Sequence, residues 1–150
     1  MKQLLLIFQF SLLSLTAFAQ VDWINIEEVT TQLAMEKKPI VLFIHTDWCK
    51  ICKMQEETVF SDEIVAKQIN TQFYALKINA EEKQSLTFLG RTYAGATANR
   101  YHELAEYLGK SNKEFYFPTL IILNEQLEVV YKKAGLVSKE EWTEWMEEMK

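Results

Sequence analysis

The chain has few of the residues that build metal centres and disulfide frameworks. Its 150 residues include 2 Cys and 2 His. Only two residues separate Cys49 from Cys52, so a bridge between them would close almost no loop and would restrict the unfolded chain little. Structural zinc normally takes four ligands, and there is no second cysteine pair. The spacing favours redox chemistry; the alternative of another class is a thiolate module that binds copper or zinc.

Other absences narrow the class of protein. There is no run of Lys or Arg, and the net charge is -5, so a nucleic-acid surface is not expected. Repeats, low-complexity tracts and an interdomain linker are also lacking. A hydrophobic fraction of 49% does not suit a disordered chain and is enough for a sizeable core. The length then indicates one domain.

The N-terminus has the pattern of a secretory signal peptide. Lys2 gives a positive start, residues 4–15 are mostly apolar, and Ala17-Phe18-Ala19 is an A-x-A cleavage site. The alternative is an uncleaved membrane anchor, but the apolar run is shorter than the ~20 residues that span a bilayer. No stable membrane insertion is expected after cleavage. The residue directly after the cleavage site is Gln20 and not Cys, which argues against a lipid anchor. We predict a signal peptide over 1–19, cleavage after Ala19, and a domain over 20–150 exported to the periplasm or beyond.

Hydrophobic periodicity predicts an α/β domain. Its expected helices and strands alternate along the chain: helix 26–37 capped by Asn25, buried strand 40–44, helix 48–69 that a Ser61 cap could interrupt, strand 73–78, hairpin 86–93 turning at Gly90, a helix from 99 or 100 to 108 ended by Gly109, strands 118–123 and 127–133, and helix 139–150 with Ser138 and Glu141 as its capping box. The apolar face of the last helix carries Trp142, Trp145, Met146 and Met149.

The two cysteines fall where a strand passes into a helix. Cys49 is expected in the first turn of that helix, where unpaired N–H groups and the helix dipole favour a thiolate. Lys50 adds a positive charge nearby. In a C-x-x-C at a helix start the first sulfur is the exposed one and the second is turned inward. We therefore expect Cys49 to attack a substrate disulfide and Cys52 to resolve the mixed disulfide.

These residues resemble the thioredoxin superfamily. The similarity covers residues 20–150 and is strongest in the strand 40–44, in Trp48-Cys49-Lys50-Ile51-Cys52-Lys53 and in Phe117-Pro118-Thr119. The resemblance implies a thioredoxin-like fold: a central mixed β-sheet flanked by helices, here with a small hairpin insertion before the third helix. It also implies a cis Pro118 that presents backbone to the substrate between Phe117 and Thr119, and a Trp48 that shields the active site.

A narrower similarity links the chain to periplasmic thioredoxin-like domains that relay electrons from the inner membrane. It rests on Asp47-Trp48-Cys49 and on Thr58-Val59-Phe60-Ser61-Asp62. In those domains a Glu seven positions after the nucleophile helps proton transfer, and Glu56 matches that position. One departure matters: Phe43 stands where thioredoxin and those domains carry a buried Asp. Proton uptake by Cys52 must then rely on water, on Glu56 or on another group.

Residues 86–97 resemble an insert of exported thioredoxin-like proteins of Bacteroidetes type. Phe88, Gly90 and Tyr93 carry that similarity. Such an insert is either a partner-specific surface or a surface addition without a function of its own. Each of the two histidines is more readily explained by a structural role than by a catalytic one. His45 ends the central strand and could approach the sulfurs. His102 should be structural.

The expected activity is reduction of disulfides in exported proteins by a dithiol/disulfide cycle of Cys49 and Cys52. A disulfide oxidase or isomerase is the alternative within the class, because the dipeptide Lys50-Ile51 does not fix the redox potential. The partners would be client proteins and a redox partner such as a membrane electron donor. No cofactor and no metal are expected.

Overall fold

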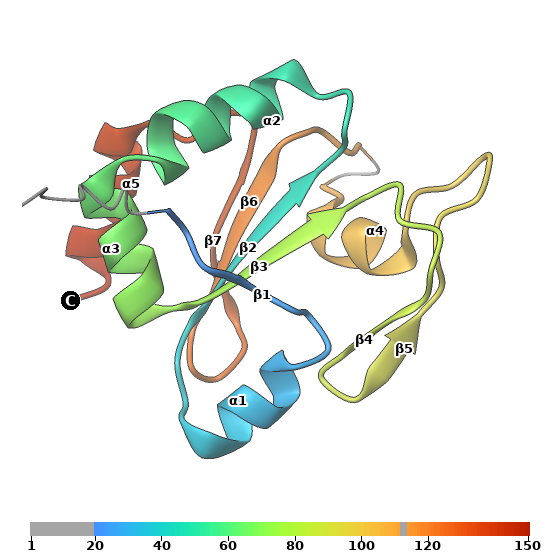
Figure 1. The fold of residues 1–150 in the computed structure, drawn as a ribbon, viewed down its shortest axis with the longest axis horizontal. Coiled ribbons are helices and arrows are strands. Elements are labelled where there is room, and N and C mark those ends of the chain that lie inside the picture. Colours follow the sequence, from blue (N-terminus) through green and yellow to red (C-terminus); the bar gives the residue numbers. More distant parts are fainter. Residues whose placement is uncertain (1–19, 112–113) are drawn as a thin grey trace, which may run out of the picture.

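A mixed five-stranded sheet forms the centre of the molecule. The computed structural model describes residues 20–111 and 114–150. The strand order is β1-β3-β2-β6-β7, with a separate two-stranded hairpin β4-β5 (Figure 1). The α/β thioredoxin-like architecture and the hairpin before the following helix are as predicted. The proposed signal peptide, residues 1–19, lies outside the described residues.

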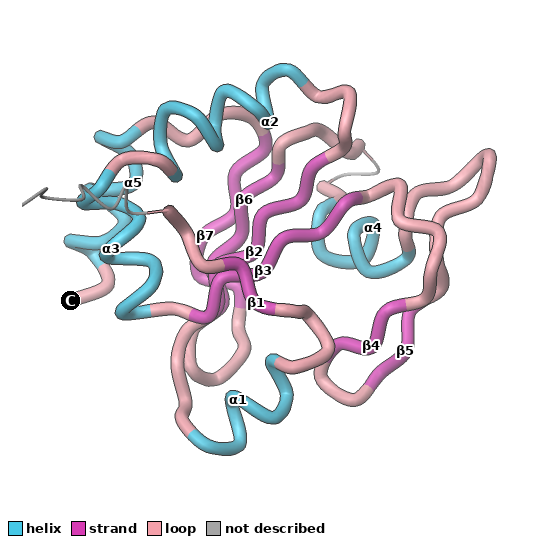
Figure 2. Tube along the Cα trace, viewed as in Figure 1, coloured by secondary structure: helices cyan, strands magenta, loops and turns pink. Residues whose placement is uncertain are grey.

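Thirteen elements make up the described chain. Figures 1 and 2 show how the helices and strands are arranged. In chain order they are β1 (Trp23–Ile24), α1 (Val29–Met35), β2 (Ile40–His45), α2 (Lys50–Gln55), the π-helix η1 (Glu56–Phe60), α3 (Glu63–Gln72), β3 (Tyr74–Asn79), β4 (Leu86–Phe88), β5 (Arg91–Tyr93), α4 (Glu103–Gly109), β6 (Thr119–Leu123), β7 (Val129–Ala134) and α5 (Lys139–Glu148).

The apolar strand β2 is the axis of the sheet. It pairs in parallel with β3, from Ile40 opposite Tyr74 to His45 opposite Asn79, and antiparallel with β6. Residues 40–44 are fully buried, because both faces of the sheet are covered. Alternate side chains therefore enter two separate apolar layers, and the strand ends at the point where the cysteine loop begins.

The helices divide between the two faces according to those layers. Phe43 and Val41 of β2 pack with α2, η1, α3 and α5 on one face. Leu42 and Ile44 pack with α1, the β4-β5 hairpin and α4 on the other. Figure 1 shows the two groups on opposite sides of the sheet. Trp142 and Met146 of α5 are buried as the pattern predicted, while Trp145 and Met149 pack at the edge of the same layer.

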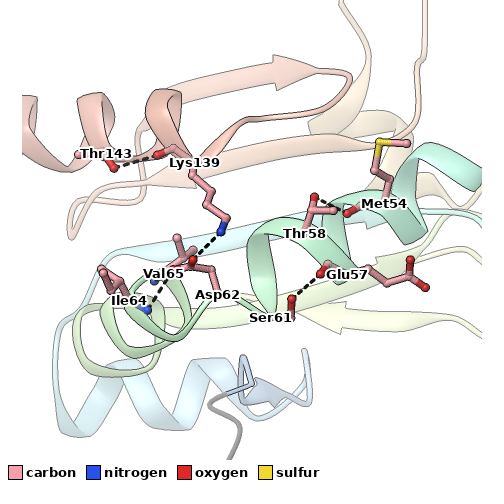
Figure 3. Close-up of polar contacts among 9 residues, drawn as sticks. All are labelled: Met54, Glu57, Thr58, Ser61, Asp62, Ile64, Val65, Lys139 and Thr143. Carbon is pink, nitrogen blue, oxygen red and sulfur yellow. Dashed lines mark hydrogen bonds and ion pairs between the residues drawn. The ribbon is translucent and has the colours of Figure 1, made fainter.

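The predicted long helix 48–69 is wrong in detail. The helix begins at Lys50, widens into the π-helix η1, and breaks before α3. The cap of α3 is Asp62 and not Ser61: Oδ1 of Asp62 accepts hydrogen bonds from the N–H groups of Ile64 and Val65, at 3.0 and 3.2 Å. A carboxylate at this position also complements the helix dipole, and it is held by Lys139 at 2.6 Å (Figure 3).

Periodicity also misplaced individual side chains near the break. The 3.6-residue period places Met54, Thr58 and Val59 on one face of the predicted helix, with Ile64, Val65 and Ile69 further on. Val59, Val65 and Ile69 are buried, but Met54 and Ile64 are 49% and 71% exposed. Ile64 lies beyond the π-helix η1, whose wider turn puts a face extrapolated at 3.6 residues per turn out of register. Gln55, which was not predicted on this face, is buried.

The other boundaries shift by a few residues. Helix α1 begins at Val29, since the Asn25 side chain accepts from the N–H of Glu27 and forms a turn ahead of the helix. Helix α4 begins only at Glu103 and includes Gly109. The Ser138–Glu141 capping box of α5 is confirmed, although α5 ends at Glu148. Within residues 20–111 and 114–150, no helix combines the length and the apolar character that crossing a membrane would require.

Candidate active site

The two cysteines form a disulfide at the end of the central strand. Their Cα atoms are 5.2 Å apart. The chain leaves β2 at His45, turns through Thr46 to Trp48, and enters α2 at Lys50. The turn is closed by the N–H of Cys49, which donates to the carbonyl of Thr46 at 3.2 Å. Cys49 thus occupies the N-cap, one position before the helix.

The Cys49 sulfur acts as the cap acceptor of α2. It accepts a hydrogen bond from the backbone N–H of Cys52 at 3.1 Å. A donor aimed at this sulfur, together with the positive end of the helix dipole, lowers the free energy of a thiolate there. Lys50 follows directly and is exposed. The electrostatic environment of Cys49 is therefore positive, as the sequence predicted.

The predicted exposure of the first sulfur is wrong for the disulfide form. Cys49 is 5% exposed and Cys52 is 2% exposed. Both belong to the apolar layer that contains Val59 and Phe60, and Phe117 packs against that layer. This burial comes from packing in the layer, which a helix pattern does not reveal.

Trp48 bridges two neighbouring segments beside the disulfide. Its indole Nε1 donates to the carboxylate of Glu81 at 3.1 Å, and its ring meets the ring of Phe117 edge-on at 6.0 Å between centroids. The side chain is nevertheless 61% exposed. Trp48 is therefore held in place at one end and presents a broad face to solvent next to the cysteines.

The Phe117–Pro118 peptide bond is cis, as predicted. The carbonyl of Pro118 accepts from the N–H of Gly135 at 2.7 Å, and the Thr119 hydroxyl donates to the carbonyl of Tyr116 at 2.7 Å. Thr119 pairs opposite Ile44, so this loop runs beside the end of β2 that leads to Cys49. The structure thus places Phe117, Pro118 and Thr119 together near the cysteine loop.

Gln55 is a site residue that the sequence reasoning missed. It lies one helical turn after Cys52 and is 1% exposed. Its amide Nε2 donates to the carbonyl of Val137 at 3.1 Å, and its Oε1 accepts from the N–H of Val137 at 2.8 Å. The signal was present: a polar amide sits on the face of the helix that buries Cys52 and Val59.

Glu56 lies on the first turn of η1 and forms an ion pair with Lys77 of β3. Phe43 pairs opposite Lys77 in the sheet, and the Lys77 ammonium lies 6.0 Å from the centre of the Phe43 ring. Phe43 is fully buried, with Phe60 edge-on at 5.0 Å. An aromatic cluster therefore occupies the interior at this position, and the nearby carboxylate is on the helix at Glu56.

The two histidines have different surroundings. His45 stacks on Phe43 at 5.7 Å, and its pKa is lowered, first by burial and then by the positive charge of Lys77. His102 is the N-cap of α4: its Nδ1 accepts from the N–H of Leu104 at 3.1 Å, and its Nε2 lies 3.2 Å from the carbonyl of Gln84. Burial lowers the pKa of His102 as well. A structural role for His102 was predicted, and its contacts agree.

The hairpin insert is anchored by its own aromatic residues. Phe88 and Tyr93 are buried in the layer that contains α1 and α4. Gly90 sits at the turn with a positive φ of 77°, a backbone conformation that glycine adopts without strain. Phe88 and Tyr93, on which the resemblance of this insert partly rests, therefore anchor it to the domain.

Metal ligation was the alternative use of the thiolates. Within residues 20–111 and 114–150, no group of three or more His, Cys, Asp or Glu side chains is gathered so that it could hold a metal ion. The two sulfurs are bonded to each other.

A C-x-x-C disulfide that follows the central strand of this fold defines a class, the thioredoxin-fold thiol–disulfide oxidoreductase domains. Comparison with known families agrees. The chain belongs to the thioredoxin-like domain family, whose pattern matches residues 26–150.

The thiol:disulfide interchange protein DsbD of Vibrio vulnificus is 39% identical over 64 residues, which are 41% of this chain and 11% of that protein. The chain therefore spans about a tenth of the length of this curated relative. Among solved structures, a proposed disulphide-isomerase from Bacteroides thetaiotaomicron has a TM-score of 0.57 at 24% identity, covering 86% of this chain and 92% of that one. The C-terminal domain of Neisseria meningitidis DsbD in the reduced form has a TM-score of 0.53 at 18% identity, covering 81% and 90%. At these identities both structures support the fold alone.

Proposed function

We propose that the protein is an exported thiol–disulfide oxidoreductase that reduces disulfides of client proteins through Cys49 and Cys52. One observation carries the proposal: the Cys49 sulfur caps the helix and receives the N–H of Cys52 at 3.1 Å. When the disulfide opens, the same donor stabilises negative charge on the Cys49 sulfur. Cys49 is then the better nucleophile of the pair.

In the first step the Cys49 thiolate attacks one sulfur of a client disulfide. A bond forms between Cys49 and that sulfur, the client disulfide breaks, and the second client sulfur leaves as a thiolate. Backbone near Pro118 lies beside the cysteine loop and would receive the extended client chain, with Phe117 and Thr119 on either side. Trp48 would shield the mixed disulfide.

In the second step the Cys52 thiol loses its proton and attacks the Cys49 sulfur. The Cys49–Cys52 disulfide closes, the bond between Cys49 and the first client sulfur breaks, and that client sulfur leaves and is protonated. Two electrons have passed to the client. Cys52 is buried, so its proton needs an acceptor, and Glu56 in the next turn is our candidate. A dithiol donor must then reduce the pair again, and a membrane-bound redox partner would serve.

Thiol–disulfide exchange is supported by the similarity to a thiol:disulfide interchange protein, and export by the sequence of residues 1–19. The reducing direction rests on the resemblance of Asp47-Trp48-Cys49 to domains that relay electrons. Titration of the purified domain 20–150 against a thiol/disulfide buffer tests the direction. A reductase should have a potential nearer to about -270 mV, as in thioredoxin, than to about -120 mV, as in DsbA. A potential above about -150 mV would make the protein an oxidase instead.

Two further measurements test the roles and the location. Limiting alkylation of the reduced protein should label Cys49 first, and preferential labelling of Cys52 would contradict the assignment. N-terminal sequencing of the protein recovered from outside the cytoplasm should begin at Gln20. Retention of residues 1–19 in the exported protein would contradict cleavage after Ala19.

A further inference from the structure

A cavity of about 1010 Å³ lies on the side of the sheet that carries α4. Three parts of the chain form its walls. Glu81 and Lys83 come from the segment after β3, Arg100 and Tyr101 from the segment before α4, and Lys110 and Phe115 from the residues that follow α4. Figure 2 shows the loops after β3 and after β5 lying side by side next to α4.

The cavity is connected to the redox site through two contacts. Glu81, in its wall, accepts the hydrogen bond of the Trp48 indole at 3.1 Å. Phe115 and Tyr101, also in the wall, pack on Phe117 at 4.6 and 5.1 Å between ring centroids. Trp48 directly precedes Cys49, and Phe117 directly precedes Pro118. A chain bound across the disulfide would therefore meet the cavity at its edge.

The walls of the cavity are held in place before any ligand binds. The N–H of Ala96 donates to the carbonyl of Glu82 at 2.7 Å. Gly95 approaches the same segment so closely that a Cβ atom at that position would lie 1.9 Å from the carbonyl oxygen of Lys83. The buried His102 adds a further tie at the carbonyl of Gln84, 3.2 Å from Nε2. A pre-organised cavity avoids the entropy cost of ordering loops on binding.

The charge of the walls differs in sign from that of the whole chain. Lys83, Arg100 and Lys110 face two carboxylates, Glu81 and Glu106. Glu106 is compensated by Arg100 at 3.4 Å and by Lys110 at 3.1 Å, Arg100 also lies 4.0 Å from Glu103, and Glu81 holds the Trp48 indole. Among the described residues Lys83 has no ion-pair partner within 4.0 Å. The cavity thus offers positive charge in a chain of net charge -5.

The chemistry of the walls selects an occupant with two parts. Lys83 and Arg100 would attract a carboxylate, and the rings of Tyr101 and Phe115 would contact an apolar side chain. We propose that this cavity binds a segment of the client polypeptide that carries an acidic side chain beside an aromatic or aliphatic one, while the client disulfide lies on Cys49. The inference rests on the proposed function and names the class of client.

Competing peptide disulfides provide the test. One synthetic peptide has an Asp-Phe pair near its disulfide, a second has Asn-Phe, and a third has Asp-Gly. Each peptide is made in two versions, with the pair before or after the disulfide-bonded cysteine. The wild-type domain should reduce the Asp-Phe peptide with a kcat/KM roughly two- to fivefold above the other two, as expected for partly screened charges. The preference should fall at high salt.

Variants locate the preference. Lys83→Glu and Arg100→Gln should remove it while leaving turnover of a small uncharged disulfide reagent unchanged. The matched control is Lys37→Glu, an exposed lysine in the segment that leads into the opposite end of β2, and it should keep the full preference. Equal kcat/KM values for the three peptides, or the same preference in all three variants, would overturn the proposal.

A binding measurement separates this inference from the proposed function. A dye-labelled Asp-Phe peptide with Ser in place of Cys should bind the wild-type domain more tightly than Lys83→Glu, by fluorescence anisotropy, whether or not exchange occurs. Absence of turnover with the small reagent would refute the oxidoreductase proposal alone. Turnover of that reagent without selective binding or reduction of the acidic peptide would refute the client site alone.

Discussion

The side-chain amide of Gln55 and the backbone of Val137 form a reciprocal pair of hydrogen bonds, at 3.1 and 2.8 Å. Both residues are buried. Gly135, two residues before Val137, donates its N–H to the carbonyl of Pro118 at 2.7 Å. The helix that carries the cysteines and the loop that carries Pro118 are therefore fastened to the same connection between β7 and α5.

Replacing Gln55 should weaken the fold and disturb this connection. Gln55→Leu leaves the buried N–H and carbonyl of Val137 without partners, which costs about 1–3 kcal/mol for each unsatisfied group. Urea unfolding of the domain should show the loss, whereas the exposed control Gln72→Leu should stay near wild type. A Gln55→Leu domain as stable as wild type would mean that the hydrogen-bond pair contributes little.

The conservative variant Gln55→Glu gives a distinct signature. One carboxylate oxygen can still accept from the N–H of Val137, but the other would face the Val137 carbonyl. Only the protonated carboxyl restores a donor there, so stability relative to wild type should recover as the pH is lowered. A difference that does not change with pH would argue against this geometry.

Mixed-disulfide trapping should separate the roles of the two cysteines. Cys52→Ser cannot resolve the intermediate on Cys49, so client proteins should accumulate on it severalfold over Cys49→Ser. Non-reducing electrophoresis after acid quenching measures the adducts. Equal trapping by both variants would show that the roles are not divided in this way.

Removing the Glu56 carboxylate should slow the resolving step. General acid–base groups contribute about 10²–10⁴-fold where no substitute exists. Water can replace part of the function at the half-exposed Glu56, so we expect Glu56→Gln to lie near the lower end of that range. Stopped-flow Trp fluorescence follows the step. The control is Glu57→Gln, which changes the next residue in the chain, an exposed glutamate. The effect should vanish at high pH, where Cys52 ionises unaided.

The Asp62–Lys139 pair should make stability depend on pH in the acid range. The hydrogen bond from Lys139, followed by the N–H of Val65, lowers the pKa of Asp62 below its usual 3.8 (Figure 3). The stability it contributes is present above the unfolded pKa and is lost as the pH falls through the folded pKa. Asp62→Ala should cost about 0.5–2 kcal/mol at pH 7. Asp62→Asn keeps a side-chain oxygen that can cap α3, so its smaller loss of stability measures the contribution of the ion pair with Lys139. If the acid transition is the same in the variants as in wild type, this account is contradicted.

Protonation of His102 should weaken the cap of α4. Burial lowers its pKa below the ordinary 6.5, and the contact with the Gln84 carbonyl and the charges of Glu82 and Glu103 offset this only in part. The unfolded chain therefore takes up the proton first, and the free energy of unfolding should fall as the pH drops below about 6.5. His45 shifts in the same direction. In His102→Asn, which keeps a capping side chain, the slope between pH 7 and 5 should become shallower, and an unaltered slope would assign it to other groups.

The sequence alone determined the elements whose signals are local. A short, continuous apolar run predicted the buried strand 40–44, and Gly90 between two β-rich segments predicted the hairpin, since strand burial and turn geometry depend on neighbouring residues. Ser138 and Glu141, which are three residues apart, predicted the capping box of α5. The C-x-x-C pair after a strand, together with Phe117-Pro118-Thr119, led to the thioredoxin-like fold.

The tertiary structure decided what depends on residues distant in the chain. Packing against the sheet decided that the helix buries Gln55 and leaves Met54 49% exposed. Gln55 acquired its partner 82 residues later, and Trp48 its partner 33 residues later. Such pairings are set by how the layers pack, and no local pattern encodes them. The cavity between the segments after β3 and before α4 likewise depends on distant residues, since Gly95 lets one of these segments approach Lys83 of the other closely.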